Sequence, residues 1–292
     1  LRSVPRPQRL NDEVLVRVHS AGVDAVGCGA SSGIPGLSFS GVVAEAAYDA
    51  HPLSVGTPVY GVSMAPRASG SYAEYVAVSV LNVARKPGAL SFTEAAAVPL
   101  SALTAWGLVV ELARAHEGQR MLIHAAGSPV GLLAVQLASY FGAHVIATCD
   151  PDEASFVRDL GAAEVIDSPA VPFEEAVAPV DAVVDLVGDT VARTGSRSLG
   201  VLRPRGLYAN GRAGSFPGMR DAAQAYGVRA TDFTVSPDAA KLAILSRLFD
   251  AGDLRVRVDR VLPLEEAAEA HRLRESGGIR GELVLSVATE TE

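Results

Sequence analysis

A turn of small residues between a predicted strand and a predicted helix has the composition of a phosphate-binding loop. A short apolar run, Met121 to Ala126, is typical of a buried parallel strand. Apolar residues then recur at helical spacing as far as Gly142, and a further apolar run ends at Asp150. Strand and helix are joined by Gly127, Ser128, Pro129, Val130 and Gly131. Because such a turn points backbone N–H groups at a pyrophosphate, this order predicts a dinucleotide-binding unit.

The turn departs from the three-glycine fingerprint of dinucleotide-binding loops. Those glycines allow a tight turn, close approach to phosphate and close packing of helix on strand. Gly127 and Gly131 remain, but Ser128 and Pro129 stand between them. Proline lacks an N–H donor. From the pattern alone, the alternative is an α/β unit in which this turn only packs helix on strand and binds no nucleotide.

The composition excludes several classes of protein. The chain has 292 residues, 49% hydrophobic and 20% charged, with a formal net charge of −8. This length suits two domains, and the negative charge argues against a nucleic-acid or anionic-membrane partner. Cys28 and Cys149 are too few for a disulfide framework or a structural zinc site, so we expect a cytoplasmic protein.

Neither a membrane span nor an export signal is expected. No apolar run approaches the roughly 18 residues of a spanning helix, and no charged-then-apolar leader opens the chain. The chain opens at Leu1 rather than at methionine, and we expect part of a first strand to precede it.

Strand patterns dominate both ends of the chain. Glu13 to His19 alternates apolar and polar residues, which predicts a half-buried strand. Ser91 and Glu94 form a capping box that starts a helix. Further strands are predicted at 41–43, 57–62, 70–78, 257–262 and 282–287.

Strands and helices alternate in the middle of the chain. Three more strands are predicted, at 163–167, 181–188 and 206–211, and a helix at 239–249 is closed by Gly252. Such alternation predicts an α/β protein with a parallel, doubly wound sheet and a ligand at the carboxyl ends of its strands.

Several segments together resemble the zinc-independent branch of the medium-chain dehydrogenase/reductase superfamily, the NAD(P)H quinone oxidoreductases and enoyl reductases. These segments are 13–23, 70–76, 94–106, 185–188 and 259–271. The resemblance implies a GroES-like β-rich domain, residues 1–100 with 254–292, and an inserted Rossmann domain, residues 101–253. It also implies a homodimer, and hydride transfer from NAD or NADP to a small quinone, enone or enoyl substrate in the cleft between the domains.

The resemblance assigns residues to this chemistry. Thr104 matches a threonine near the nicotinamide. Val187 and Gly188 match a strand end that contacts the cofactor, and Asn210 and Gly211 match the next such turn.

Tyr60, Asp24 and Thr104 are the candidates for the catalytic site, where the protein stabilises charge on a substrate carbonyl oxygen. We expect Tyr60 to face the substrate. The alternative is a strand tyrosine with its hydroxyl in solvent.

After the second strand of the nucleotide unit the chain departs from the family pattern. Asp150 and Asp152 stand where NADPH users often have a serine and a basic residue. Carboxylates repel a 2′-phosphate and accept hydrogen bonds from a ribose 2′-OH, so these residues favour NADH. The alternative for Asp150 is a helix N-cap before Pro151.

Four further departures, three substitutions and one short segment, fall on cofactor and substrate positions. Ser38 replaces an aspartate, Asp24 an asparagine and Glu282 a lysine, and the segment from Asp24 to Pro35 is short. With the altered turn, these departures raise an alternative function. A redox-silent member of the fold would catalyse an isomerisation, elimination or cyclisation, or bind a small ligand, without NAD(P)H.

No metal site is expected. Zinc-dependent relatives use a cysteine and a Gly-His-Glu pair for the catalytic ion and four cysteines for the structural ion, and the matching stretches here have neither. We expect His124 and Cys149 to be buried residues without a catalytic role.

Overall fold

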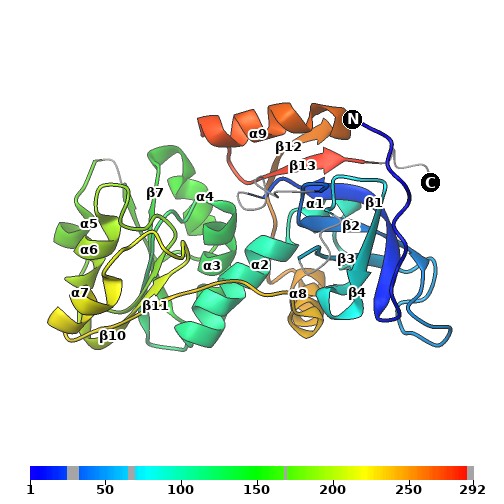
Figure 1. The fold of residues 1–292 in the computed structure, drawn as a ribbon. Helices are drawn as coiled ribbons and strands as arrows, with labels where there is room; N and C mark the ends of the chain where they lie inside the picture. Colours follow the sequence, from blue (N-terminus) through cyan, green and yellow to red (C-terminus); the bar gives the residue numbers. More distant parts are fainter. Residues whose placement is uncertain (25–32, 65–69, 168–169, 288–292) are drawn as a thin grey trace. The chain divides into compact units, whose positions relative to one another are not determined.

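The computed structural model describes residues 1–24, 33–64, 70–167 and 170–287. The chain divides into two compact units (Figure 1). Unit 1 comprises Leu1–Leu103 and Ser236–Glu292, and unit 2 comprises Thr104–Val235.

The sheet of unit 1 is organised around its first strand. Among the described residues it has seven strands in the order β12-β13-β1-β2-β3-β5, with β4 paired to β1. The strands are β1 (Glu13–Gly22), β2 (Ser38–Glu45), β3 (Pro58–Val62), β4 (Tyr75–Ser79), β5 (Val83–Arg85), β12 (Val258–Pro263) and β13 (Glu282–Ser286). β1 pairs antiparallel with β2, β4 and β13, so it joins the N-terminal strands to the C-terminal tail.

The prediction that β1 is half-buried was wrong. Every residue of β1 except Arg17 is buried. The helix α1 (Phe92–Ala96) packs on β1, and the Phe92 ring stacks on His19 with centroids 4.2 Å apart. The polar position at His19 is thus covered by a helix instead of by water, whereas Arg17 stays exposed.

Helices complete unit 1. The predicted capping box at the start of α1 is confirmed, because the Ser91 and Glu94 side chains each accept a backbone N–H from the other residue. The remaining elements are α2 (Pro99–Trp106), which continues into unit 2, α8 (Ala239–Ala251), α9 (Ala267–Ser276), η1 (Val80–Asn82) and η4 (Leu264–Glu266). The helix α8 packs on β5 and so belongs with unit 1, although its sequence position suggested the nucleotide-binding domain.

Unit 2 contains the predicted parallel sheet. Its described residues form six strands in the order β11-β10-β9-β6-β7-β8, and every neighbouring pair is parallel. The strands are β6 (Arg120–Ile123), β7 (His144–Cys149), β8 (Glu164–Asp167), β9 (Val180–Asp185), β10 (Leu202–Asn210) and β11 (Arg229–Asp232). From β6 the chain winds outward through β7 and β8, then crosses to β9 on the other side. This reversal beside β6 is where open α/β sheets bind ligands.

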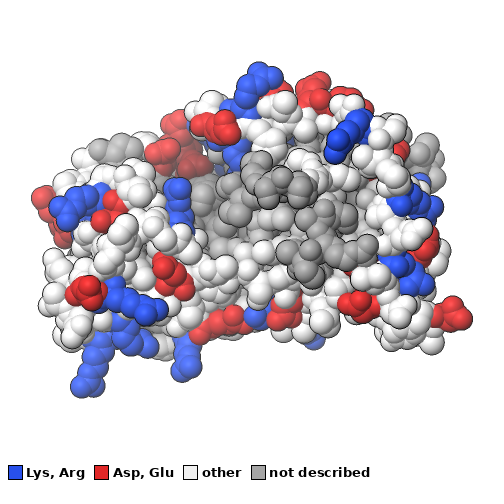
Figure 2. Space-filling model, viewed as in Figure 1, with Lys and Arg blue, Asp and Glu red and all other residues white. Residues whose placement is uncertain are grey.

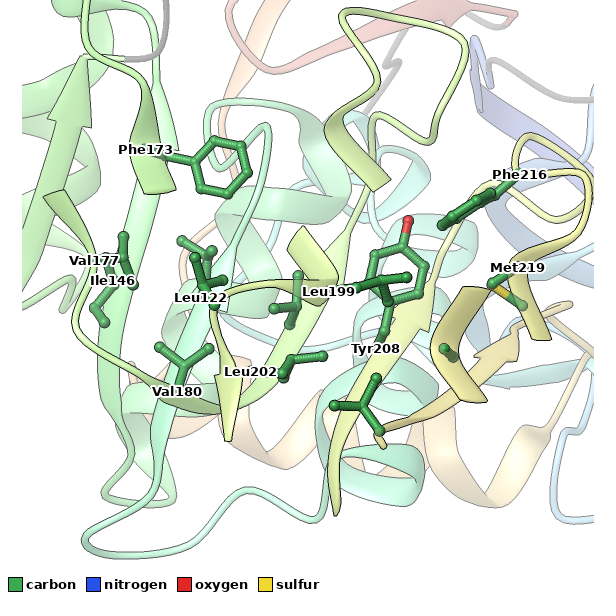
Figure 3. Packing of buried hydrophobic residues seen from close by; sticks show 14 of the residues in the cluster. Leu122, Ile146, Phe173, Val177, Val180, Leu199, Leu202, Tyr208, Phe216 and Met219 are labelled. Atoms are coloured by element: carbon green, nitrogen blue, oxygen red, sulfur yellow. The ribbon is translucent and has the colours of Figure 1, made fainter. Parts of the chain in front are cut away.

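The helices of unit 2 connect these strands. They are η2 (Gly107–Leu112), α3 (Pro129–Tyr140), η3 (Pro151–Glu153), α4 (Ala154–Asp159), α5 (Phe173–Ala176), α6 (Thr194–Leu199) and α7 (Met219–Ala225). Figure 3 shows how apolar residues from neighbouring strands and helices pack together, with Leu122, Ile146 and Val180 from the sheet and Leu199 and Met219 from the helices. This core fixes the strands whose ends carry the candidate site.

Charged side chains of both signs are spread over the described surface. On the face shown in Figure 2, lysine and arginine are interspersed with aspartate and glutamate, and the described residues there form no continuous basic surface.

We predict that Gly41 is required for the pairing of β1 with β2. A Cβ added at Gly41 would lie 2.1 Å from the Arg17 carbonyl oxygen, whereas one at Gly88 would meet only the Asp250 Oδ1 atom, at 3.7 Å. Gly41→Ala should lower the free energy of unfolding by about 1–3 kcal/mol, and Gly88→Ala should change it by less than about 0.5 kcal/mol. Urea unfolding measures both. Equal effects of the two substitutions would contradict the close approach at Gly41.

Candidate functional site

The turn after β6 satisfies the Ser128 and Gly131 N–H groups within itself. Ser128 is the N-cap of α3; its Oγ accepts the Gly131 N–H at 3.1 Å and donates to the Ala125 carbonyl oxygen at 2.7 Å. The Ser128 N–H also donates to Ala125, and Pro129 has no N–H. Among the contacts of the described residues, the Val130 N–H has no partner, which leaves it as the donor that the helix terminus offers to an anion.

The two glycines of the turn have different surroundings. A Cβ at Gly131 would lie 2.3 Å from the Ala125 carbonyl oxygen and 2.7 Å from the Ala126 Cα, so Gly131 lets α3 pack directly on the end of β6. A Cβ at Gly127 would lie 1.7 Å from Glu153 Oε2. A carboxylate therefore faces the backbone of the turn.

Three acidic residues follow β7 beside this turn. Asp150 and Asp152 are exposed, and Glu153 is partly buried. Asp150 occupies the N-cap position of η3, but its side chain makes no capping hydrogen bond, so it is available for another contact. Sequence reasoning missed Glu153, although its spacing of three from Asp150 would put both on one face of a helical turn.

Asp185 shapes the loop that carries Val187 and Gly188. Its carboxylate is fully buried at the end of β9, where Oδ1 accepts the N–H groups of Val187 at 2.7 Å and Gly188 at 3.0 Å. The Tyr208 hydroxyl donates to Oδ2 at 2.5 Å. Burial and the adjacent carboxylate raise the pKa of Tyr208 above its ordinary value, so the phenol stays a donor.

Asn210 shapes the next loop in the same way. Its buried amide donates to Asp232 Oδ1 at 2.7 Å and to the Arg212 carbonyl oxygen, and it accepts the Arg212 N–H at 3.0 Å. The Gly211 N–H donates to the Asp185 carbonyl oxygen at 2.8 Å. The loops after β9 and β10 are therefore joined.

The carboxyl ends of neighbouring strands bring the predicted cofactor residues of unit 2 to one edge of the sheet. The strand β6 lies between β7 and β9, and β10 lies beyond β9. At this edge lie the turn from Gly127 to Gly131, the acids after β7, and the loops with Val187, Gly188, Asn210 and Gly211.

The helical turn η2, which follows Thr104 in the chain, lies beside the loop after β10. Thr104 is partly buried near the end of α2, and the helix then widens, with the Ala113 N–H donating to Leu108 five residues earlier at 3.0 Å. A Cβ at Gly211 would lie 3.1 Å from Leu108 Cδ1. The widened turn thus approaches the loop after β10, and such widened turns are frequent at functional sites.

Asp24 lies in unit 1 and is buried. Its carboxylate accepts the Ser38 N–H and the Ser38 hydroxyl, both at 2.9 Å. The Ser38 Oγ in turn accepts the Leu100 N–H at 3.3 Å, at the start of α2. Burial raises the pKa of Asp24 to about 6.

Glu282 belongs to the same buried region. Its Oε1 accepts the Ser101 hydroxyl at 2.6 Å, and its Oε2 accepts an N–H of Arg274 from α9. Burial and, to a lesser extent, the Asp24 carboxylate raise the pKa of Glu282 to about 7, although the Arg274 guanidinium opposes this rise. We call Asp24, Ser38, Ser101, Arg274 and Glu282 the α2 anchor network. Two of the departures from the family pattern, Asp24 and Ser38, thus contact each other, and the third, Glu282, is paired with Ser101 and Arg274.

The prediction that Tyr60 faces the substrate disagrees with the geometry, and so does the alternative with its hydroxyl in solvent. Tyr60 is fully buried inside unit 1. Its hydroxyl donates to the Leu242 carbonyl oxygen at 2.7 Å and lies 3.0 Å from Ser246 Oγ, so it ties β3 to α8. Tyr60 is a packing residue because α8 covers this face of the sheet.

His124 and Cys149 are buried, as predicted. His124 Nδ1 lies 3.0 Å from Thr148 Oγ1, and Nε2 lies 3.0 Å from Ser198 Oγ. Because the Ser198 hydroxyl donates to Thr194, it accepts from Nε2, which assigns the proton to that nitrogen. Burial lowers the pKa of His124 to about 4 and raises that of Cys149 to about 11. Cys28 and most of the short segment after Asp24 lie outside the described residues.

The described part of the chain has neither a metal-binding cluster nor a membrane-spanning helix. No group of three or more His, Cys, Asp or Glu in that part is placed to hold a metal ion. Within the same ranges, no helix has the length and apolar character needed to cross a bilayer.

The loops of unit 2 fit a dinucleotide, with fewer phosphate donors than a glycine fingerprint supplies. Gly131 provides the close helix–strand packing, and the Val130 N–H lies at the helix N-terminus. The carboxylates after β7 are groups that accept hydrogen bonds from ribose hydroxyls in dinucleotide-binding folds. The loops after β9 and β10 are held by buried hydrogen bonds, which suits a preorganised binding site.

Comparisons with known proteins agree with this architecture. The profile of a family described as zinc-binding dehydrogenase matches residues 160–285. The NAD(P)H oxidoreductase RTN4IP1, mitochondrial, of Danio rerio is 29% identical over 94% of this chain and 84% of its own length. The structure of the quinone oxidoreductase from Coxiella burnetii has a TM-score of 0.89 and 32% identity, covering 98% of this chain and 93% of that one. The CurK enoyl reductase structure has a TM-score of 0.84 and 25% identity, covering 98% and 94%.

The two units are therefore the GroES-like and Rossmann units of a dehydrogenase fold. The chain belongs to the medium-chain dehydrogenase/reductase superfamily. Within it, the chain is similar to quinone oxidoreductases and enoyl reductases. The name of the matched family profile refers to zinc, whereas zinc independence of this chain stays a prediction.

We predict that Tyr60→Phe affects stability and not chemistry. Removing the hydroxyl leaves the buried Leu242 carbonyl oxygen without this donor, which should lower the free energy of unfolding by about 1–3 kcal/mol. Tyr226→Phe, at a side chain that is 57% exposed, is the matched control and should change little. Urea unfolding and steady-state kinetics measure the two effects. A large loss of kcat with unchanged stability would restore the substrate-facing role.

Proposed function

We propose that this protein is an oxidoreductase that transfers a hydride from a nicotinamide cofactor to a quinone, an enone or an enoyl substrate. The observation that carries the proposal is the convergence of the predicted cofactor loops of unit 2 at the carboxyl edge of its parallel sheet. Similarity to a quinone oxidoreductase along nearly the whole chain supports it.

The chain's own residues would position the cofactor. The nicotinamide supplies the hydride when bound, so the protein needs little acid–base machinery. The Val130 N–H would donate to the pyrophosphate. Asp185 and Asn210 would hold the loops that contact the nicotinamide end, since both side chains are fully used in shaping those loops.

The α2 anchor network supports reduction over the redox-silent alternative. Asp24, Ser38 and Glu282 looked like separate losses of functional residues, but their polar atoms are paired with one another or with Ser101 and Arg274. Mutually compensating substitutions keep a buried region intact. They give no reason to infer a loss of hydride transfer. The observation that favours the alternative is the reduced donor set of the turn after β6.

The acids after β7 favour NADH over NADPH. Asp150 and Asp152 are exposed, and the Glu153 carboxylate lies against Gly127. Three carboxylates beside the phosphate turn would repel a 2′-phosphate, and they offer acceptors to a ribose 2′-OH. We further propose a cytoplasmic, zinc-independent homodimer acting on a small molecule.

The assay for the proposed function uses purified protein with NADH and either phenanthrenequinone or an α,β-unsaturated ketone. Acceptor-dependent loss of NADH absorbance is the expected result. Conversion of an unsaturated substrate without any nicotinamide would instead support the redox-silent alternative.

We predict that removing the acids after β7 changes cofactor preference. The combined variant Asp150→Asn, Asp152→Asn, Glu153→Gln should raise kcat/KM for NADPH relative to NADH by about tenfold, because less repulsion faces the 2′-phosphate. Asp159→Asn, which removes an exposed acid of α4, is the matched control and should leave the ratio unchanged. A wild-type protein that already prefers NADPH would show that the acids do not face the ribose.

A further inference from the structure

An aromatic ring of unit 2 lies against the backbone of the widened turn η2. Gly107, the first residue of η2, is buried. A Cβ added at Gly107 would lie 2.0 Å from Cζ and 2.2 Å from Cε2 of the Phe233 ring. Position 107 therefore has room for a side chain only if the ring moves. The ring fills the space that the glycine leaves open.

The backbone of Phe233 is fixed at the carboxyl edge of the parallel sheet. Phe233 directly follows β11, and its N–H donates to the Asn210 carbonyl oxygen, at the end of β10, at 2.8 Å. The side chain is partly buried. Phe233 thus joins the ends of β10 and β11 to η2, and all of these residues belong to unit 2.

The Phe233 contact lies on the helix face that carries Thr104. Thr104 precedes Gly107 by three residues and Leu108 by four, so the three positions share one face. The Cα–Cβ bonds of a helix tilt toward its N-terminus, so a ring in the Cβ position of Gly107 lies toward the turn that contains Thr104. On the same face, Leu108 Cδ1 would lie 3.1 Å from a Cβ at Gly211, in the loop after β10.

Two locally unfavourable features occur together immediately after Thr104. A glycine within a helix is destabilising relative to alanine, and widened turns are rare except at functional sites. Such departures from local preference are expected where a site must be positioned, and they need compensation from packing. The Phe233 ring supplies apolar packing at the point where Gly107 supplies none.

We propose that Phe233 is a positioning residue for the nicotinamide end of the cofactor. Its ring, seated on Gly107, holds the helix face with Thr104 against the ends of β10 and β11. Phe233 acts through Thr104, so it need not touch the cofactor itself. This inference rests on the proposed function, since it takes Thr104 as a contact of the nicotinamide.

The two halves of the cofactor should respond differently to loss of the ring. Under the proposed function, the pyrophosphate and the adenosine ribose meet the turn after β6 and the acids after β7. The nicotinamide meets Thr104 and the loops after β9 and β10. Removing the Phe233 ring should therefore weaken binding of NADH and spare ADP-ribose, a probe that lacks the nicotinamide.

The test measures the dissociation constants of NADH and ADP-ribose by titration calorimetry. Phe233→Ala should raise that of NADH about tenfold, within the range of couplings between sites, and change that of ADP-ribose by less than about twofold. Phe173→Leu is the control for lost packing alone, since Phe173 is buried in the core of unit 2 against His124. Phe173→Leu should lower the urea midpoint and leave the ratio of the two dissociation constants unchanged.

A double-mutant cycle tests whether the contact with Gly107 is the cause. Gly107→Ala places a methyl group where the ring lies and displaces it, so the dissociation constant of NADH should again rise about tenfold. In Gly107→Ala with Phe233→Ala the rise should stay near tenfold, because both substitutions remove one shared contact. Independent effects would instead multiply to about a hundredfold.

The outcomes separate this inference from the proposed function. An unchanged dissociation constant of NADH in Phe233→Ala, an equal rise for ADP-ribose, or multiplied effects in the double variant would each overturn the positioning role. These results would leave the oxidoreductase proposal intact, provided that the wild type binds NADH. A wild type that binds neither NADH nor ADP-ribose would overturn both.

Discussion

Buried carboxyl groups impose the strictest constraint on both units of this protein. A carboxylate removed from water must have its acceptor sites filled, or it must keep a proton. In unit 2, Asp185 meets this demand with two backbone N–H groups and the Tyr208 hydroxyl, and thereby fixes the loop after β9. In unit 1, Asp24 and Glu282 meet it with serine hydroxyls and one arginine, and thereby fix the start of α2.

This constraint changes the meaning of the substitutions at Asp24, Ser38 and Glu282. Each of these three substitutions replaces a residue that the family uses, and together they suggest an active site that has lost its function. In the structure, Asp24 is hydrogen-bonded to Ser38, and Glu282 is hydrogen-bonded to Ser101 and Arg274. Arg274 supplies from α9 the positive charge that a lysine at position 282 would supply from β13. The same buried region is thus kept with its charges rearranged, which is consistent with a retained reductase.

Patterns local in sequence predicted most of the fold, and contacts distant in sequence account for what they missed. The capping box at Ser91 and the doubly wound sheet followed from short-range spacing. The covering of β1 depends on α1, and the burial of Tyr60 in β3 depends on α8. No pattern within β1 or β3 reveals these contacts. The candidate cofactor residues were found through motifs, whereas the pairing of Asp24 with Ser38 and of Glu282 with Arg274 required the folded chain. Glu153 was missed because its contact with Gly127 arises across two different strand ends.

The most direct test of the account follows the hydride itself. Purified protein is given NADH deuterated at C4, on the face from which transfer occurs, together with an α,β-unsaturated ketone, and the product is examined by mass spectrometry. We expect a saturated product that carries one deuterium from the cofactor. A product formed without deuterium from either C4 epimer of NADH would contradict it, and would mean that the loops at the carboxyl edge of unit 2 serve a reaction other than hydride transfer.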